Sequence, residues 1–362
     1  MKLLKYIIRI CNYRKAYTIL NLCGLSIGFT AFILIYNYVD FERSYDLFNP
    51  HVDNVYRVEN TLLRQNEIII ESAEGLAALG EYSLKNYSEV KDYVKIYNVG
   101  AKNNNSITVG GSENKTFLEK KLFFATASFP KMFALKFLEG NGDLSKPNQV
   151  IISKSIALKY FGSKEEVLGE SIDFRDDDGR SNELIISGVF EDYRRDSHLD
   201  FELVISFKTI ITDDQSHERF ENAWRRFDFL NYLELANDAN VQSLENQLSE
   251  YATQMAGLND DDRGYEYVFS LKPIKNIHLD KSITNEIKPT NSAKKLNIIL
   301  LIGVFVLILG WINFINLTTA AAIGRAKEVG VRKVLGASKI QIIIHYLLES
   351  IIISALAFLL SM

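Results

Sequence analysis

The chain has 362 residues, of which 41 are basic and 45 are acidic, and its formal net charge is −4. This length allows two or three structural units, and the near-zero mean hydropathy conceals apolar residues that are concentrated near the two ends. The middle region, residues 40–295, has a net charge of −12, which argues against nucleic-acid binding, and it has no cysteine, so disulfides cannot hold it together.

Residues 1–18 contain five basic residues and no acid. Their apolar residues recur at helical spacing, at Leu3, Leu4, Ile7, Ile8 and Cys11. This pattern predicts an amphipathic helix that lies in the membrane interface on the cytoplasmic side. The alternative is the charged start of a signal peptide. Against it, the apolar run that follows is long and lacks an Ala-x-Ala cleavage signal.

The first transmembrane helix is expected at residues 19–39, because residues 21–39 carry no charge over 19 positions and a bilayer core needs about 20 apolar helical residues. Gly24 and Gly28 lie four residues apart in this run. Glycines at this spacing let a second helix approach closely, so we expect them on a packing face.

Residues 40–295 have globular composition, and two βαβ-like units are expected at the start and the end of this region. The expected strands of the first unit are 55–58, 68–70 and 93–97, with a helix over 72–87. The second unit is expected as strand 231–235, helix 241–255 and strand 265–271. Two such units separated in the chain predict a split ferredoxin-like lobe.

A second, β-rich lobe is expected between the two units. Its predicted strands are 106–109, 149–152, 183–190 and 201–207, and its predicted helix is 153–161. Gly162 follows this helix as a C-terminal cap, and residues 176–179 form a hairpin turn. The fold class is therefore α+β, with transmembrane helices on either side.

Residues 296–322 carry no charge over 27 positions, and residues 340–362 form a third apolar run. Both are predicted transmembrane helices. The loop between them, residues 323–339, holds five basic residues and one acid, which places it in the cytoplasm. Within it, residues 328–335 have helical composition, and Gly336 is suited to cap the C-terminus. The loop is either a topology anchor or a short helix presented to a cytoplasmic partner.

Glu349 lies inside the third apolar run, where an ionised carboxylate is costly. It is expected either to be protonated or to pair with a polar residue of the preceding span, such as Asn313 or Asn316. A role in helix packing is favoured over a role in transport.

No chemistry of a catalytic or cofactor-binding kind is indicated. The chain has no Gly-x4-Gly-Lys-Ser/Thr phosphate loop, and its five histidines show no paired ligand spacing. The acidic run at residues 260–262 lacks the alternating ligands of a calcium loop, so we interpret it as a solvated turn. Neither a metal nor a cofactor is expected.

Several spaced motifs resemble those of MacB/FtsX-type ABC transporter permeases. The most specific is Glu328-Val-Gly-Val-Arg-Lys-Val-Leu-Gly-Ala337, which is similar to the motif that follows the second transmembrane helix in that family. Further matching segments are Asn21–Gly28, Ser44–Asp46, Val55–Val58, Phe137–Gly140, Val150–Ser153, Lys159–Gly162 and Ile186–Val189. The resemblance covers nearly the whole chain.

This resemblance implies a permease subunit that carries ATPase-driven motion across the inner membrane to a periplasmic domain with porter-like and Sabre-like lobes. The implied partners are a cytoplasmic ABC ATPase, a second permease copy or half, membrane lipids and a periplasmic protein. The implied ATPase-coupling residues are Glu328, Val329, Gly330, Val331, Arg332, Lys333, Leu335 and Gly336. Family members have a fourth helix, so the chain is expected to be part of a longer permease.

Two other functions stay open. A regulatory membrane protein of the FtsX type would control a periplasmic cell-wall hydrolase through the same topology. A receptor with an outer ligand-binding domain would signal without any ATPase. What the outer domain binds distinguishes these alternatives from export of a substrate.

Overall fold

The computed structural model describes residues 15–100, 105–110, 115–162, 166–177, 179–258, 264–323 and 326–362. The chain divides into two compact units, one formed by Ser44–Asn291 and the other by Met1–Arg43 together with Ser292–Met362. The residue range expected for the outer region, 40–295, includes all residues of the first unit. Most of the expected interfacial helix of residues 1–18, and the acidic turn at 260–262, lie outside the described residues.

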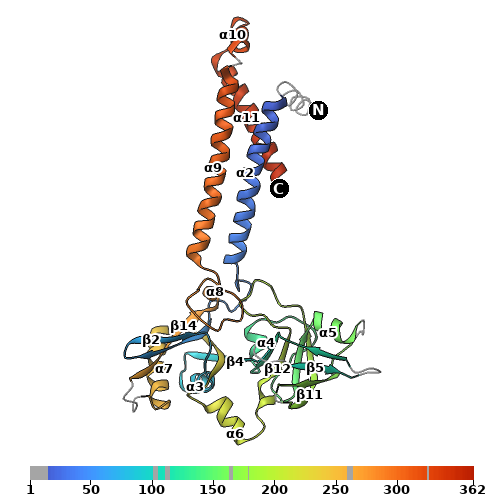
Figure 1. Cartoon of the computed structure of the whole chain (residues 1–362), viewed down its shortest axis with the longest axis vertical. Helices are drawn as coiled ribbons and strands as arrows, with labels where there is room; N and C mark the ends of the chain where they lie inside the picture. The colour runs from blue at the N-terminus through green and yellow to red at the C-terminus, as the bar shows by residue number, and fades with distance from the viewer. Residues whose placement is uncertain are drawn as a thin grey trace. The chain divides into compact units, whose positions relative to one another are not determined.

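The helical unit contains long apolar helices and one short helix. They are α2 (Lys15–Arg43), α9 (Ala293–Ile323), α10 (Ala326–Val334) and α11 (Lys339–Ser361). Among the described residues, α2, α9 and α11 are long and apolar enough to cross a membrane. The helix α2 packs against both α9 and α11 (Figure 1). The helix α2 extends past the uncharged run that predicted it at both ends, and α9 begins three residues before its run. The helix α11 covers nearly the same residues as its run.

One lobe of Ser44–Asn291 is a ferredoxin-like sheet. Its main elements are β1 (Val55–Arg64), α3 (Leu79–Asn86), β4 (Val90–Asn98), β13 (Phe227–Leu235), α7 (Val241–Met255) and β14 (Tyr265–Pro273). The strand order is β14-β1-β13-β4, and all three pairings are antiparallel. Two βαβ units interleaved in this way are the split βαβ arrangement that the sequence predicts. The short strands β2 (Glu67–Ser72) and β3 (Gly75–Leu76) pair with β1 and β13.

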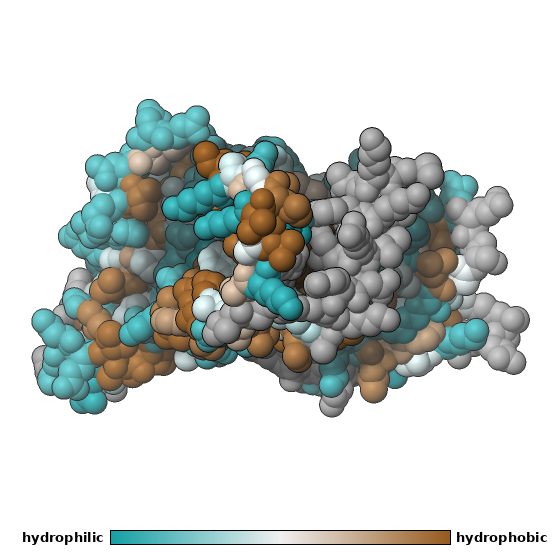
Figure 2. Space-filling view, turned by 90° about the horizontal axis from the view of Figure 1, so that it is seen from above, coloured by the Kyte–Doolittle hydropathy of each residue, from teal (hydrophilic) through white to brown (hydrophobic). Residues whose placement is uncertain are grey.

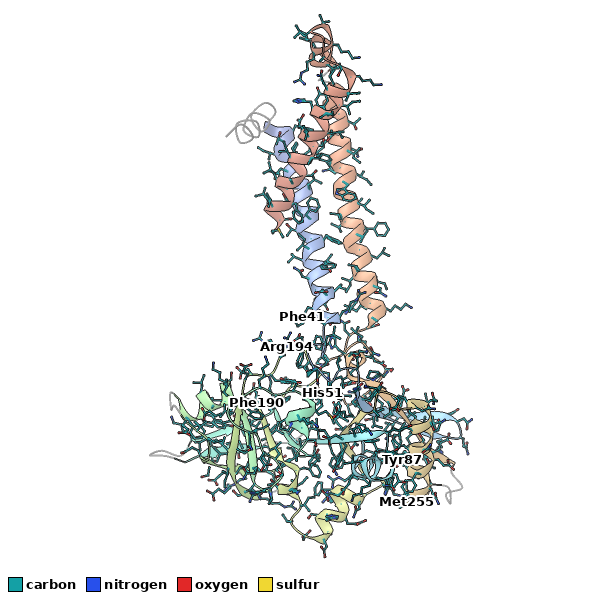
Figure 3. All side chains as sticks on the ribbon, turned by 180° about the vertical axis from the view of Figure 1, so that it is seen from behind. Phe41, His51, Tyr87, Phe190, Arg194 and Met255 are labelled. Atoms are coloured by element: carbon teal, nitrogen blue, oxygen red, sulfur yellow. The ribbon has the colours of Figure 1, made fainter. Side chains whose placement is uncertain are left out.

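The second lobe is inserted between β4 and β13. Its strands are β5 (Ser106–Val109), β6 (Lys115–Leu118), β7 (Leu122–Ala125), β8 (Phe137–Gly140), β9 (Gln149–Ser153), β10 (Ser171–Arg175), β11 (Ser181–Phe190) and β12 (Leu203–Ser206). Its short helical segments are α4 (Phe129–Met132), α5 (Lys154–Phe161), η1 (Phe207–Ile210), α6 (Asp214–His217) and η2 (Glu218–Asn222). Figure 3 labels Phe190 in this half of the domain, and Tyr87 and Met255 in the other.

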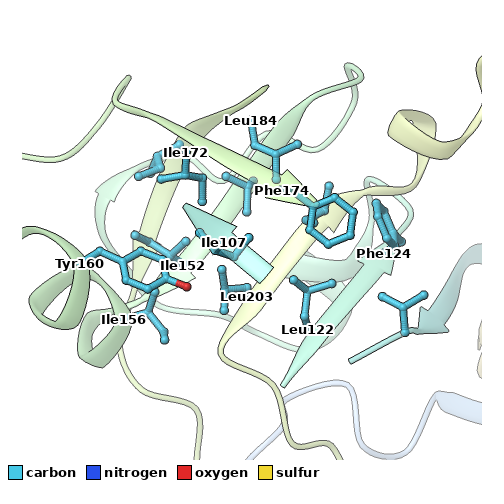
Figure 4. Packing of buried hydrophobic residues seen from close by; sticks show 14 of the residues in the cluster. Ile107, Leu122, Phe124, Ile152, Ile156, Tyr160, Ile172, Phe174, Leu184 and Leu203 are labelled. Carbon is cyan, nitrogen blue, oxygen red and sulfur yellow. The ribbon is translucent and has the colours of Figure 1, made fainter. Parts of the chain in front are cut away.

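The two lobes share one hydrogen-bonded sheet. The pairing of β4 with β7, which includes Tyr97 opposite Phe124, joins the ferredoxin-like order to β7-β12-β9-β11-β10-β5-β6. Apolar side chains of β5, β7, β9, β10, β11 and β12 form a core on one face of the second lobe (Figure 4). A separate apolar cluster lies between the ferredoxin-like strands and α7, where Leu244 and Leu248 are buried. Burial of these side chains supplies the main stabilising free energy of each lobe.

One expected element differs from the structure. The sequence favours a helix over residues 72–87, but only Leu79–Asn86 is helical, and Gly75–Leu76 pairs with β13. Residues 73–79 are buried, and Asn231 donates a hydrogen bond from its Nδ2 to the Leu76 carbonyl over 3.0 Å. Contacts with β13 therefore override the helical composition of this segment.

Candidate functional site

The short helix α10 is connected to α11 through two consecutive caps. The Ala337 N–H donates to the Arg332 carbonyl and the Gly336 N–H to the Lys333 carbonyl, each over 3.0 Å, and Gly336 has φ +93°. These two bonds around a left-handed residue form a Schellman cap. Ser338 then begins α11 with a capping box, in which its side chain accepts from the Gln341 N–H. The joint between the helices is therefore fully hydrogen-bonded and short.

The surface of α10 combines apolar and basic residues. Val334 and Leu335 are 88% and 80% exposed, and Val331 is also exposed. Lys333 is exposed as well, whereas Arg332 is half-buried. Figure 2 shows the whole chain from above, where hydrophobic and hydrophilic residues lie next to each other. Exposed apolar residues are thus grouped with an exposed lysine at the end of one short helix.

The other expected residues of the coupling segment are also placed, with one exception. Gly330 lies within α10, and nothing lies within 4 Å of the position that a Cβ would take. Val329 is half-buried and faces a cavity of the helical unit. The side chain of Glu328 lies outside what the structure describes.

The glycines of the first span lie against α9. A Cβ on Gly24 would be 3.0 Å from Nδ2 of Asn313, and a Cβ on Gly28 would be 3.8 Å from Cα of Gly310. Glycines at these positions therefore allow the two backbones to approach closely. The remaining candidate of this group, Asn316, is exposed on α9.

Glu349 lines a cavity of about 230 Å³ in the helical unit. Tyr17 and Thr318 also line it, and the Tyr17 hydroxyl donates to Thr318 Oγ1 over 2.9 Å. Val329 of α10 and Tyr346 of α11 complete part of its wall. Glu349 thus shares this cavity with Tyr17 of α2 and Thr318 of α9, whereas Asn313 lies beside Gly24.

A buried polar cluster connects the residues that follow α2 with the second lobe. Asp46 Oδ2 lies 2.8 Å from Nδ1 of His198, and Nε2 of His198 lies 2.9 Å from the Tyr232 hydroxyl. The Ser197 hydroxyl donates to the other carboxylate oxygen of Asp46 over 2.6 Å. All four residues are buried. Buried polar groups that satisfy each other in this way hold a segment in one arrangement.

A second buried cluster connects β1 with the residues that precede α9. Arg57 is 1% exposed and donates from Nη1 and Nη2 to the two carboxylate oxygens of Glu286, each over 2.6 Å. Its Nη2 also donates to Glu59 over 2.7 Å. Burial acts to lower the pKa of Arg57, but the hydrogen bond and charge of Glu286 outweigh it, so the pKa lies above its ordinary value.

The sequence analysis did not identify either cluster. Arg57 lies in a central strand between Tyr56, which is half-buried, and Val58, which is fully buried. The sequence contained one local signal for the buried arginine. It is a charged residue inside a predicted strand, with an apolar residue on either side. Its partner Glu286 is 229 residues away in the chain, so no local pattern could identify the pair.

Helices long and apolar enough to cross a membrane come before and after the α+β domain in the chain. This order defines a membrane protein with a large domain on one side of the bilayer. The family model described as MacB-like periplasmic core domain matches residues 18–251, and the model described as FtsX-like permease C-terminal matches residues 300–362. The chain belongs to the MacB/FtsX family of ABC transporter permeases. It is an inner-membrane protein with a periplasmic core domain.

One curated relative is the macrolide export ATP-binding/permease protein MacB of Aggregatibacter actinomycetemcomitans. It is 23% identical over 246 residues, which are 66% of this chain and 34% of the relative. The chain therefore spans about a third of the length of that relative.

Two solved structures match part of the chain. One is a domain of a permease-type protein from Porphyromonas gingivalis, with a TM-score of 0.49 and 18% identity over 62% of this chain and 91% of that one. The other is the periplasmic region of MacB from Actinobacillus actinomycetemcomitans, with a TM-score of 0.38 and 15% identity over 59% of this chain and 88% of that one.

Proposed function

We propose that the chain transmits motion from a cytoplasmic ABC ATPase across the inner membrane to its periplasmic domain, for export or extraction of a substrate. In this proposal residues 323–339 are the cytoplasmic coupling segment, residues 40–295 are the domain that is moved, and ATP hydrolysis takes place in the partner. The chain works as a pair, either with a second copy or with another permease half.

The observation that carries the proposal is the combination of an exposed, apolar and basic α10 with a short capped joint to α11. Docking would bury Val334 and Leu335, which are now in contact with solvent. Covering an exposed side chain of this kind contributes about 1.5–3 kcal/mol. Because the Schellman cap and the capping box leave no unstructured linker between α10 and α11, a displacement of α10 is passed to a membrane helix.

The first test is the charge reversal R332E/K333E in the full chain, followed by purification and identification of any ABC ATPase that is retained. The expected result is loss of the ATPase. The matched control is K294E/K295E, which reverses two adjacent exposed lysines in the first turn of α9. Retention of the ATPase by R332E/K333E would show that the coupling segment is assigned incorrectly.

A second variant separates docking from membrane orientation, because removing basic residues also changes the charge that orients the spans. Leu335→Asp keeps all four basic residues of 326–339 and places a carboxylate on the exposed apolar surface. We expect ATPase affinity to fall about 30-fold, which corresponds to about 2 kcal/mol. Thermal stability should not change, since Leu335 is 80% exposed.

The regulatory alternative is distinguished by what the periplasmic domain retains. A cell-wall hydrolase that copurifies with the full chain would favour control of that enzyme over export. An exported lipoprotein, peptide or drug bound to the domain would favour the transport function.

A further inference from the structure

A cavity of about 560 Å³ lies in the periplasmic domain where the two lobes meet. Its wall comes from Tyr97 at the end of β4, Phe124 of β7 and Phe174 of β10, and it is covered by residues 209–220. Sites for small organic ligands have volumes of about 300–1,000 Å³. This cavity therefore has the size of a ligand site, and the fold places it at the junction between two lobes.

The inner wall of the cavity is aromatic. Phe124 and Phe174 pack edge to face with ring centroids 5.6 Å apart, and Figure 4 shows both at the same end of the core cluster. Phe220 and Tyr97 form a second ring pair with centroids 5.9 Å apart. Phe124 and Phe174 are buried in the core, so the half-buried rings of Tyr97 and Phe220 provide the apolar surface on which the body of a ligand can pack.

Two buried polar atoms of the cavity lining have no partner among the described residues. Asn105 is 1% exposed; its Nδ2 donates to the Val99 carbonyl over 3.0 Å, but its Oδ1 accepts no hydrogen bond. The Nε of Arg226 donates to Asp228 over 2.8 Å, whereas its buried Nη1 donates to no group. A buried polar atom without a partner costs about 1–3 kcal/mol, so a bound polar group would stabilise both residues.

The charge around the cavity favours an anion. Arg180 and Arg219 line it and are exposed, and neither guanidinium has a carboxylate within 4 Å in the part of the chain that the structure describes. The lining also holds two acids, Asp176 and Asp213, which offset part of the charge of Arg180, Arg219 and Arg226 and leave an excess of one positive charge. Asp176 accepts from the Arg180 N–H over 2.8 Å and Asp213 from the Ser216 N–H over 2.7 Å.

We propose that this cavity binds an amphipathic organic anion, with its apolar body against the aromatic wall and its carboxylate at Arg226. Arg180 and Arg219 attract the anion to the opening, and Asn105 Oδ1 accepts a hydrogen bond from a donor of the ligand or from a water that it retains. A ligand held between two lobes stabilises one arrangement of them. The site goes beyond the proposed coupling to an ATPase and does not depend on it.

The test is calorimetric titration of the full chain in lipid nanodiscs with naphthaleneacetate, compared with its neutral isostere naphthaleneacetamide and with empty nanodiscs. The carboxylate is expected to bind at least about tenfold more tightly than the amide. Equal affinities would overturn the proposal. Absence of binding at about 1 mM would also overturn it, and would leave water as the occupant.

The variant R180E/R219E tests the charge of the opening with two exposed residues, so folding is not affected. We expect the affinity for naphthaleneacetate to fall at least about tenfold, whereas R175E, an exposed change on β10 outside the cavity, should leave it unchanged. R226Q should also lose about tenfold or more, with circular dichroism as its check of folding. Unchanged affinity in R180E/R219E would refute the site even if R226Q failed to fold.

Discussion

The most informative perturbation of the periplasmic domain is Arg57→Met, because it removes one charge from a buried group of three. Met preserves most of the apolar stem but leaves Glu286, at 10% side-chain exposure, without its cation, while Glu59, at 3%, keeps only Lys272 Nζ at 3.5 Å. Removing one partner of a buried ion pair costs about 3–5 kcal/mol, since the remaining charge is neither paired nor solvated. In a domain of this size, each kcal/mol lowers the unfolding temperature by about 2–4 °C, so a fall of roughly 10 °C is expected.

The assay is thermal unfolding of the full chain in detergent, followed by the far-ultraviolet circular dichroism of the sheet. Arg64→Met is the matched control on the same strand. Arg64 is exposed and lies 5.6 Å from the centre of the Tyr265 ring, a contact that contributes about 0.5–1 kcal/mol. The double variant R57M/E286Q should recover part of the loss, because one unpaired charge is removed. If R57M unfolds at the temperature of R64M, the buried pair does not hold the segment before α9 to the sheet.

Three further changes test other parts of the structure. Gly24→Leu should force α2 from α9 at Asn313 and cost about 1–3 kcal/mol of thermal stability, whereas Ile27→Leu on the exposed side of α2 should not; equal effects would contradict the packing face. Gly336→Ala introduces a Cβ at φ +93° and costs about 1 kcal/mol or more, so amide exchange at the α10–α11 joint should accelerate, and unchanged exchange would mean that the cap is not rigid. Burial lowers the pKa of Lys95 from 10.5 to about 8. Between pH 8 and pH 10.5 the unfolded chain therefore binds more protons than the folded chain. The unfolding free energy of the wild type should rise with pH relative to that of Lys95→Met, by roughly 3 kcal/mol across this pH range. A difference that does not depend on pH would show that Lys95 titrates normally.

Elements with a strong local pattern could be predicted from the sequence. The apolar spacing over 241–255 predicts α7 with the observed bounds, and residues 106–109 predict β5. The apolar runs predict the membrane helices, because twenty uncharged residues in succession have few stable places outside a bilayer. Gly336 predicts the end of a short helix, since a left-handed cap favours glycine.

The sequence analysis did not predict some strands that the structure contains, and there is a physical reason for this. β7 is a run of four buried residues, Leu122–Ala125, without the alternation that marks a half-buried strand. It is covered on both faces, and its pairing with β4 joins the two lobes. The strand is therefore determined by its neighbours in the sheet, which lie elsewhere in the chain.

Local sequence patterns and tertiary contacts also determine different features of the buried polar residues. The sequence by itself predicted three apolar segments long enough to cross a membrane, a basic loop between two of them and an outer domain with two lobes. Only the tertiary structure decided that Arg57 pairs with Glu286, that Asp46 meets His198 and that Asn105 faces a cavity. Local patterns determine helices and strands because their periodicity lies in adjacent residues. The partner of a buried charge depends on which distant segments the sheet brings together.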